Sequence, residues 1–151
     1  MPSQTQEDYF SLLEKRESGE VVTNVADYML LRGYEAKDVG FWFRLGLKLY
    51  ERKAPDRMGR HLTLLAAFYS SQQQQMIAEG LFKEAEKQLR GKSNYDRVMC
   101  LNMYGRMIMR NPRREREAAS MLKESENLAK KLPYWYFRLS NLLLFDFDFS
   151  S

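Results

Sequence analysis

The fold is decided by the stretch Trp42-Phe43-Arg44-Leu45-Gly46-Leu47-Lys48-Leu49. Wound into a helix, this stretch carries apolar side chains on almost every face. A helix of that kind needs neighbouring elements on more than one side to cover it. The stretch therefore predicts an inner helix of a larger helical assembly.

Helical signals continue on both sides of this stretch. Asp38 is the expected cap of the helix that holds Trp42, and Gly33 ends the periodic segment before it. Asn111 followed by Pro112 marks another helix start. No segment alternates well enough to build a sheet, so we expect an all-α protein of about eight helices joined by short loops. The expected helices span about 3–18, 21–32, 38–52, 56–71, 77–90, 95–110, 112–132 and 134–149, with the glutamine run 72–75 open as helix or connector.

The apolar faces of these helices predict how they pack. The helices around Trp42 and Val98 are apolar on more than one side, whereas those that hold Ala85 and Ala118 are apolar on one face only. Stacked antiparallel hairpins require this alternation, because an inner helix touches neighbours on both flanks. A compact bundle around one central helix is the alternative. The expected buried face of the helix at 77–90 holds Ile77, Leu81, Ala85 and Leu89.

Length and composition favour one domain over residues 1–151, long enough to bury its own core. The net charge of +4 permits an acidic partner without demanding one. A lone cysteine, Cys100, excludes an internal disulfide framework and favours a reducing compartment. Residues 1–8 contain no basic residue, and no segment approaches about 20 apolar residues, so we expect neither a secretory signal nor a membrane span. These features favour an intracellular, cytoplasmic protein.

The stretch around Trp42 resembles the first helix of a tetratricopeptide repeat, whose 34-residue unit begins W-x2-L-G. Trp42, Leu45 and Gly46 match that pattern in register, and Tyr104-Gly105 stands where a later Leu-Gly pair would. The resemblance implies stacked helical hairpins in a right-handed superhelix, closed by a capping helix and tail at 134–149. It also implies a groove that binds a peptide or a helix of a partner protein.

The groups with the most potential for chemistry are the single histidine, His61, and the single cysteine, Cys100. A structural zinc site takes four ligands, mostly of these two types, so we expect no metal site. The two residues could form a nucleophile–base pair across helices, but each lies in an apolar helical stretch, which favours a packing role. No phosphate-binding glycine loop or nucleophile motif occurs. We therefore expect neither enzymatic activity nor a cofactor.

The strongest polar feature is a cluster of arginines at one helix junction: Arg106, Arg110, Arg113, Arg114 and Arg116. Three of them follow Pro112 in the first helical turn, where the helix dipole favours negative charge. One interpretation is a bound carboxylate or phosphate, which arginine holds with two hydrogen bonds. The other is pairing with the neighbouring Glu115 and Glu117.

These observations predict a non-catalytic interaction module that binds an acidic peptide or helix of a partner protein. The arginine cluster would hold the acidic group, and Phe147 and Phe149 in the tail are further candidate contacts. RNA binding through the basic face at residues 106–116 is one alternative. A self-associating assembly factor, whose tail phenylalanines join two copies into a homo-oligomer, is the other.

Overall fold

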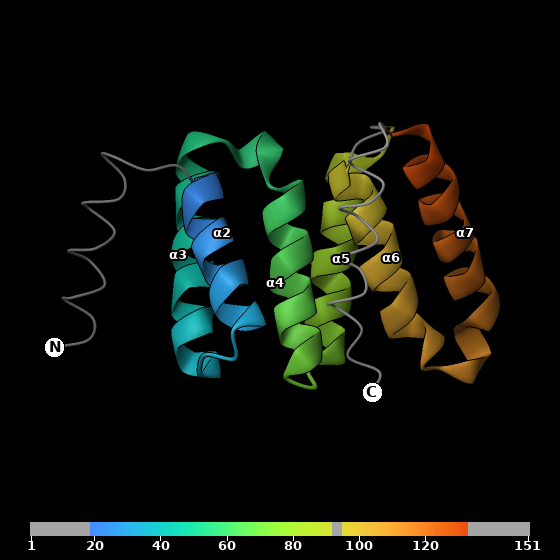
Figure 1. Ribbon diagram of the computed structural model, residues 1–151, viewed down its shortest axis with the longest axis horizontal. Helices are drawn as coiled ribbons and strands as arrows, with labels where there is room; N and C mark the ends of the chain where they lie inside the picture. Colours follow the sequence, from blue (N-terminus) through green and yellow to red (C-terminus); the bar gives the residue numbers. More distant parts are fainter. Residues whose placement is uncertain (1–18, 92–94, 133–151) are drawn as a thin grey trace, which may run out of the picture.

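The computed structural model describes residues 19–91 and 95–132, which form six α-helices and two short 3-10 helices (Figure 1). No strand occurs among these residues, so the all-α prediction is confirmed. The elements are α2 (Gly19–Leu31), α3 (Ala36–Lys53), η1 (Pro55–Arg57), α4 (Gly59–Ser71), α5 (Gln75–Leu89), α6 (Tyr95–Met109), η2 (Pro112–Arg114) and α7 (Glu115–Lys131).

The described part of the chain thus contains six α-helices where the sequence predicts about eight over the whole chain. The expected first helix at 3–18, and the capping helix and tail at 134–149, lie outside the described residues. The glutamine run is mainly a connector: residues 72–74 are exposed, Gln73 has a φ of 63°, and α5 begins at Gln75.

Two helix ends test the expected stop and start signals. Gly33 has a φ of 78°, a left-handed conformation that favours glycine, and it follows the end of α2 as predicted. The cap of α3 is different, because Glu35 rather than Asp38 occupies the N-cap position. Asp38 instead lies in the first turn, where its negative charge interacts favourably with the helix dipole.

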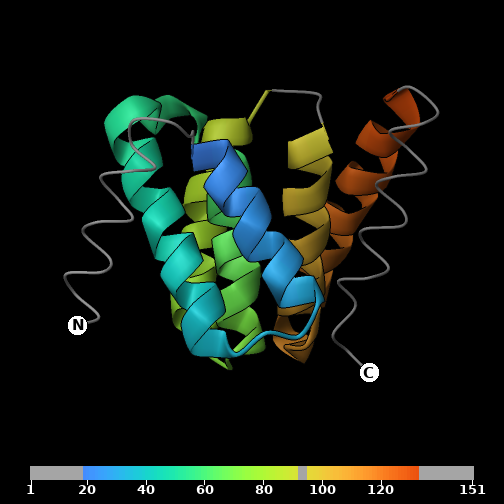
Figure 2. The same ribbon diagram turned by 60° about the vertical axis from the view of Figure 1, so that its left-hand side comes forward.

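Consecutive helices pack in pairs, α2 with α3, α4 with α5, and α6 with α7 (Figures 1 and 2). The middle pair joins the outer two, because α4 contacts α2, α3 and α6, and α5 contacts α6. The helix that carries Trp42 therefore pairs with the helix before it, and its interpretation as the first helix of a pair is wrong. Local sequence describes that helix well but does not say which neighbour it joins.

Burial is greatest in α4 and α6. Every residue from 61 to 68 of α4 is buried, and α6 is buried on several sides, as expected from its pattern. Trp42 in α3 is only partly buried. In α5 the buried face is shifted from the predicted one: Ile77 is 48% exposed, and Ala78 and Phe82 face the core instead.

Replacing glycine with alanine should change the stability of the protein in opposite directions at two positions. A Cβ atom at Gly59 would lie 2.6 Å from Cγ and Cδ2 of the buried Leu89, so Gly59→Ala should destabilise the protein by about 1–3 kcal/mol. A Cβ atom at Gly80 meets nothing within 4 Å, so Gly80→Ala in α5 should stabilise it by about 0.5–1 kcal/mol. Urea unfolding followed by circular dichroism measures both shifts. A Gly59→Ala variant as stable as the wild-type protein would contradict the close approach of α4 and α5 at Gly59.

Candidate partner-binding site

The predicted arginine cluster surrounds one corner of the molecule, where α6 ends and α7 begins. Arg106 lies in α6 and Arg110 follows it, while Arg113 belongs to η2. The side chain of Asn111 accepts a hydrogen bond from the backbone N–H of Arg113 at 3.1 Å, and Pro112 opens η2. The predicted helix start is therefore confirmed, although its first turn is a 3-10 helix.

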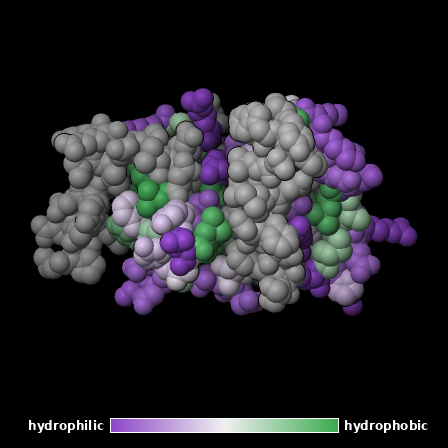
Figure 3. All heavy atoms as spheres, viewed as in Figure 1, coloured by the Kyte–Doolittle hydropathy of each residue, from purple (hydrophilic) through white to green (hydrophobic). Residues whose placement is uncertain are grey.

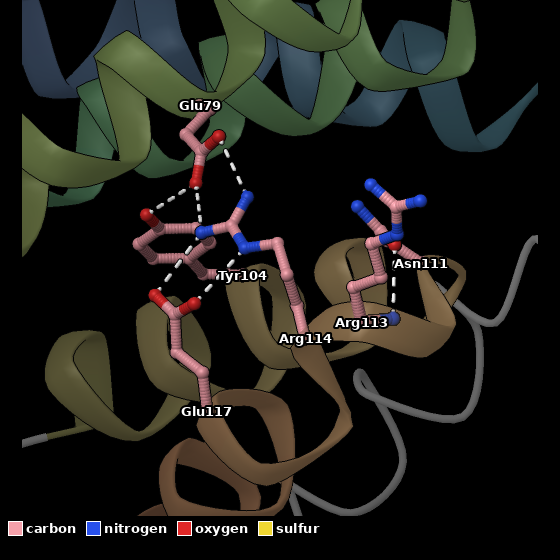
Figure 4. A network of polar contacts seen from close by, with 6 residues as sticks. All are labelled: Glu79, Tyr104, Asn111, Arg113, Arg114 and Glu117. Carbon is pink, nitrogen blue, oxygen red and sulfur yellow. Dashed lines mark hydrogen bonds and ion pairs between the residues drawn. The ribbon is translucent and has the colours of Figure 1, made fainter.

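One arginine of the cluster is held on both sides by carboxylates. Arg114 donates two hydrogen bonds to Glu79 of α5, at 2.9 and 2.6 Å, and two to Glu117 of α7, at 2.9 and 3.0 Å (Figure 4). The pairing with Glu117 agrees with one of the two interpretations from the sequence. Glu79 was not foreseen, because 35 residues separate it from Arg114. Arg114 is thus a structural residue and is not available to a partner.

A tyrosine completes this polar network. The Tyr104 hydroxyl donates to Glu79 at 2.8 Å, and its ring stacks on Phe82 with 5.2 Å between the centroids and 5° between the planes. Hydrogen bonding from Arg114 lowers the pKa of Glu79 below its usual range, and burial together with Glu79 raises the pKa of Tyr104. Glu79 is therefore charged and Tyr104 neutral at neutral pH. The network ties α5, α6 and α7 together and holds the corner in one geometry.

We expect the Arg114–Glu79 pair to contribute measurably to stability. Its side chains are 28% and 22% exposed, so water screens the pair only in part. A double-mutant cycle with Arg114→Gln and Glu79→Gln should give a coupling free energy of about 1–2 kcal/mol. The cycle for Arg90 and Glu86, a pair at the C-terminal end of α5 whose arginine is 71% exposed, should give a smaller value. Equal couplings would contradict the structural role of Arg114.

Three other arginines of the cluster remain open to a ligand. Arg110, Arg113 and Arg116 are exposed, and within 19–91 and 95–132 their side chains make no ion pair or hydrogen bond. Figure 4 shows the guanidinium of Arg113 apart from the network of Glu79, Arg114 and Glu117, with no contact drawn to it. Arg106 is partly buried and has an interaction of its own. The corner therefore combines one fixed cation with three available ones.

The histidine and the cysteine lie in the core. The His61 ring lies 5.4 Å from the ring of Tyr50 and 6.0 Å from that of Phe43, measured between centroids. The Cys100 Sγ lies 3.9 Å from the carbonyl oxygen of Phe82, and burial raises the thiol pKa to about 11. The thiol is therefore protonated at neutral pH. Within the described ranges, no group of three or more His, Cys, Asp or Glu residues could hold a metal ion.

An exposed methionine near the corner was not predicted. Met76, in the first turn of α5, is 91% exposed, whereas most large apolar residues of the described chain are buried. A helical projection centred on Phe82 would have placed Met76 away from the buried face.

Hydrophilic side chains dominate the described part of the face in Figure 3, and hydrophobic residues form small separate patches there. Phe147 and Phe149 lie outside the described residues.

Neither a known protein family, nor a curated protein, nor a solved structure matches this chain. The resemblance to tetratricopeptide repeats thus rests on a few residues and on the pairing of helices. No helix among the described residues is long and apolar enough to span a membrane.

Proposed function

We propose that this protein is a non-catalytic interaction module that binds an acidic segment of a partner protein at the α6–α7 corner. The proposal depends on one observation: Arg110, Arg113 and Arg116 are exposed and have no ion-pair partner in the described structure. Arg114, in the same cluster, has two such partners. Arginine binds carboxylates through two parallel hydrogen bonds, and a fixed corner reduces the entropy lost on binding.

Electrostatics near the start of α7 also favour an anion. Unpaired cations in the first turn of a helix cost a few tenths of a kcal/mol to about 1 kcal/mol, because the helix dipole is positive there. Arg113 precedes α7 and Arg116 lies in its first turn, so a bound carboxylate would offset part of this cost. In the free protein, Glu115 and Glu117 in the same turn offset this cost only in part.

We also propose that the helix pairs belong to a short solenoid of the tetratricopeptide kind, with α2, α4 and α6 as the first helices of successive hairpins. Support comes from the pairing of consecutive helices and from the contacts of α4 with both α2 and α6. Solenoids of stacked hairpins present extended surfaces and corners to partner proteins. An interaction module is the function that this architecture suits best.

Charge reversal at the corner tests the proposal. The variant Arg110→Glu/Arg113→Glu/Arg116→Glu should lose a protein partner that the intact chain captures from lysate, because each arginine–carboxylate bond is worth about 1.5–3 kcal/mol. Arg114 is left in place to preserve the fold. The matched control Lys37→Glu/Lys87→Glu/Lys131→Glu changes three other exposed residues and alters the net charge equally.

Treating half of each eluate with nuclease separates protein binding from RNA binding. A nuclease-resistant partner that the arginine variant loses and the lysine variant keeps would support the proposal. Recovery of RNA, with proteins that disappear after nuclease, would favour the basic face as a nucleic-acid surface. Identical partners for all three chains would overturn the assignment of the corner.

A further inference from the structure

Met76 is the most exposed of the large apolar residues in the described part of the chain. Its side chain is 91% exposed, so it contributes almost nothing to the core, and Ile77 beside it is 48% exposed. The connector before α5, residues 72–74, is also exposed. A flexible and polarisable methionine side chain adapts well to the apolar group of a partner. Binding a partner over such a surface is favourable, because it removes apolar side chains from water.

Met76 lies at the same end of the molecule as the arginines of the corner (Figure 1). It is three residues before Glu79, so the two side chains share one side of α5, about one turn apart. Glu79 is bonded to Arg114, and Arg113 is the next residue along the chain. The α4–α5 connector and the α6–α7 corner also lie at the same end of the molecule, the lower end in Figure 1. An apolar group and at least one unpaired cation therefore border the same site.

We propose that Met76, together with Arg110 and Arg113, forms a docking rim for a protein segment that presents an apolar side chain beside carboxylates. This inference rests on the proposed function and specifies the chemistry of the partner. Met76 covers the apolar side chain, and the two arginines bind the carboxylates on either side of it. Charge complementarity fixes the sign of the partner, since the five arginines of the cluster outnumber the carboxylates beside them, Glu79, Glu115 and Glu117.

The apolar element of the rim argues for a protein rather than RNA. Single-stranded RNA is held largely by bases stacked on aromatic side chains. The exposed aromatic residues of the described chain are Tyr28 and Tyr34, in α2 and just after it, and Tyr104 near the corner is buried. Methionine offers no ring for a base, whereas it packs readily on leucine, phenylalanine or another methionine.

The test uses a phage-displayed library of random peptides, selected on the full chain. Peptides that carry an apolar residue flanked by Asp or Glu should be enriched. The enriched peptide is then synthesised with a fluorescent label, and its Kd is measured by anisotropy. Met76→Gln should weaken binding at least about tenfold, and Arg113→Glu by a similar factor or more. Leu31→Gln, a polar substitution at a 41% exposed residue of α2, should leave the Kd unchanged.

The outcomes separate this inference from the proposed function. If Arg113→Glu abolishes binding and Met76→Gln does not, the docking rim is wrong and the acidic-segment proposal stands. If neither substitution weakens binding, or if no acidic peptide is enriched, both are overturned. Single-stranded RNA can also be added as a competitor of the labelled peptide. If RNA displaces the peptide, and neither Arg113→Glu nor Met76→Gln changes how well it does so, the docking rim is likewise overturned.

Discussion

Replacing Phe82 with alanine should destabilise the protein by about 3–5 kcal/mol, the usual cost of removing a large ring from a packed core. Phe82 is 1% exposed and lies at the centre of the buried face of α5. Its ring stacks on Tyr104 of α6. The substitution leaves a cavity between these two helices and removes the support of the Tyr104 ring. Urea unfolding at neutral pH, followed by circular dichroism, measures the loss.

The matched control for this prediction lies in the same helix. Met76→Ala removes a large apolar side chain that is 91% exposed, so stability should change by less than about 0.5 kcal/mol. If Phe82→Ala cost no more than Met76→Ala, the packing of α5 against α6 would be wrong. A stable Met76→Ala variant would also show that effects of position 76 on peptide binding do not come from unfolding.

Protonation of His61 should destabilise the protein as the pH falls. Burial lowers the pKa of His61 from 6.5 to about 4, although a backbone hydrogen bond with Phe43 acts in the opposite direction. The folded state therefore favours the neutral ring, and the stabilisation is fully present above pH 6.5 and lost as the pH falls towards 4. About 2 kcal/mol should be lost between pH 7 and pH 5, and about 3 kcal/mol in full.

Two carboxyl groups modify this dependence and help to isolate it. Burial raises the pKa of Asp27, so the folded state takes up a proton there and gains stability as the pH falls. Hydrogen bonding from Arg114 lowers the pKa of Glu79 below 4.5, so its contribution is present above pH 4.5 and lost only below it. The interval from pH 7 to pH 5 therefore reports mainly on His61, with Asp27 opposing it.

The measurement is the free energy of unfolding at several pH values between 7 and 5. In the wild-type protein this free energy should fall as the pH falls. In the variant His61→Gln, most of this pH dependence should be lost, whatever the stability of the variant at pH 7. Asp27→Asn should keep the slope or make it steeper, because the opposing proton uptake is gone. A wild-type protein and a His61→Gln variant with the same slope would contradict the assignment to His61.

Several features were predictable from the sequence because they depend on neighbouring residues. The left-handed Gly33 after α2, and Asn111 with Pro112 before α7, are signals contained within about one helical turn. The all-round burial of α6 follows from apolar residues on several faces of the same helix. The arginine cluster at the α6–α7 corner was also predictable, because its members are close in sequence.

Other features were decided only by the tertiary structure. The sequence alone established a helical chain with a basic corner, because periodicity, caps and sequence-local charge are properties of single segments. It did not establish that the Trp42 helix pairs with α2, that Phe82 rather than Ile77 faces the core, or that Glu79 holds Arg114. Each of these depends on which distant helix packs alongside, and that choice follows from the shape and burial of the whole assembly. For the same reason, Arg114 holds helices together through Glu79, whereas Arg110 and Arg113 are left without an ion pair in the described structure.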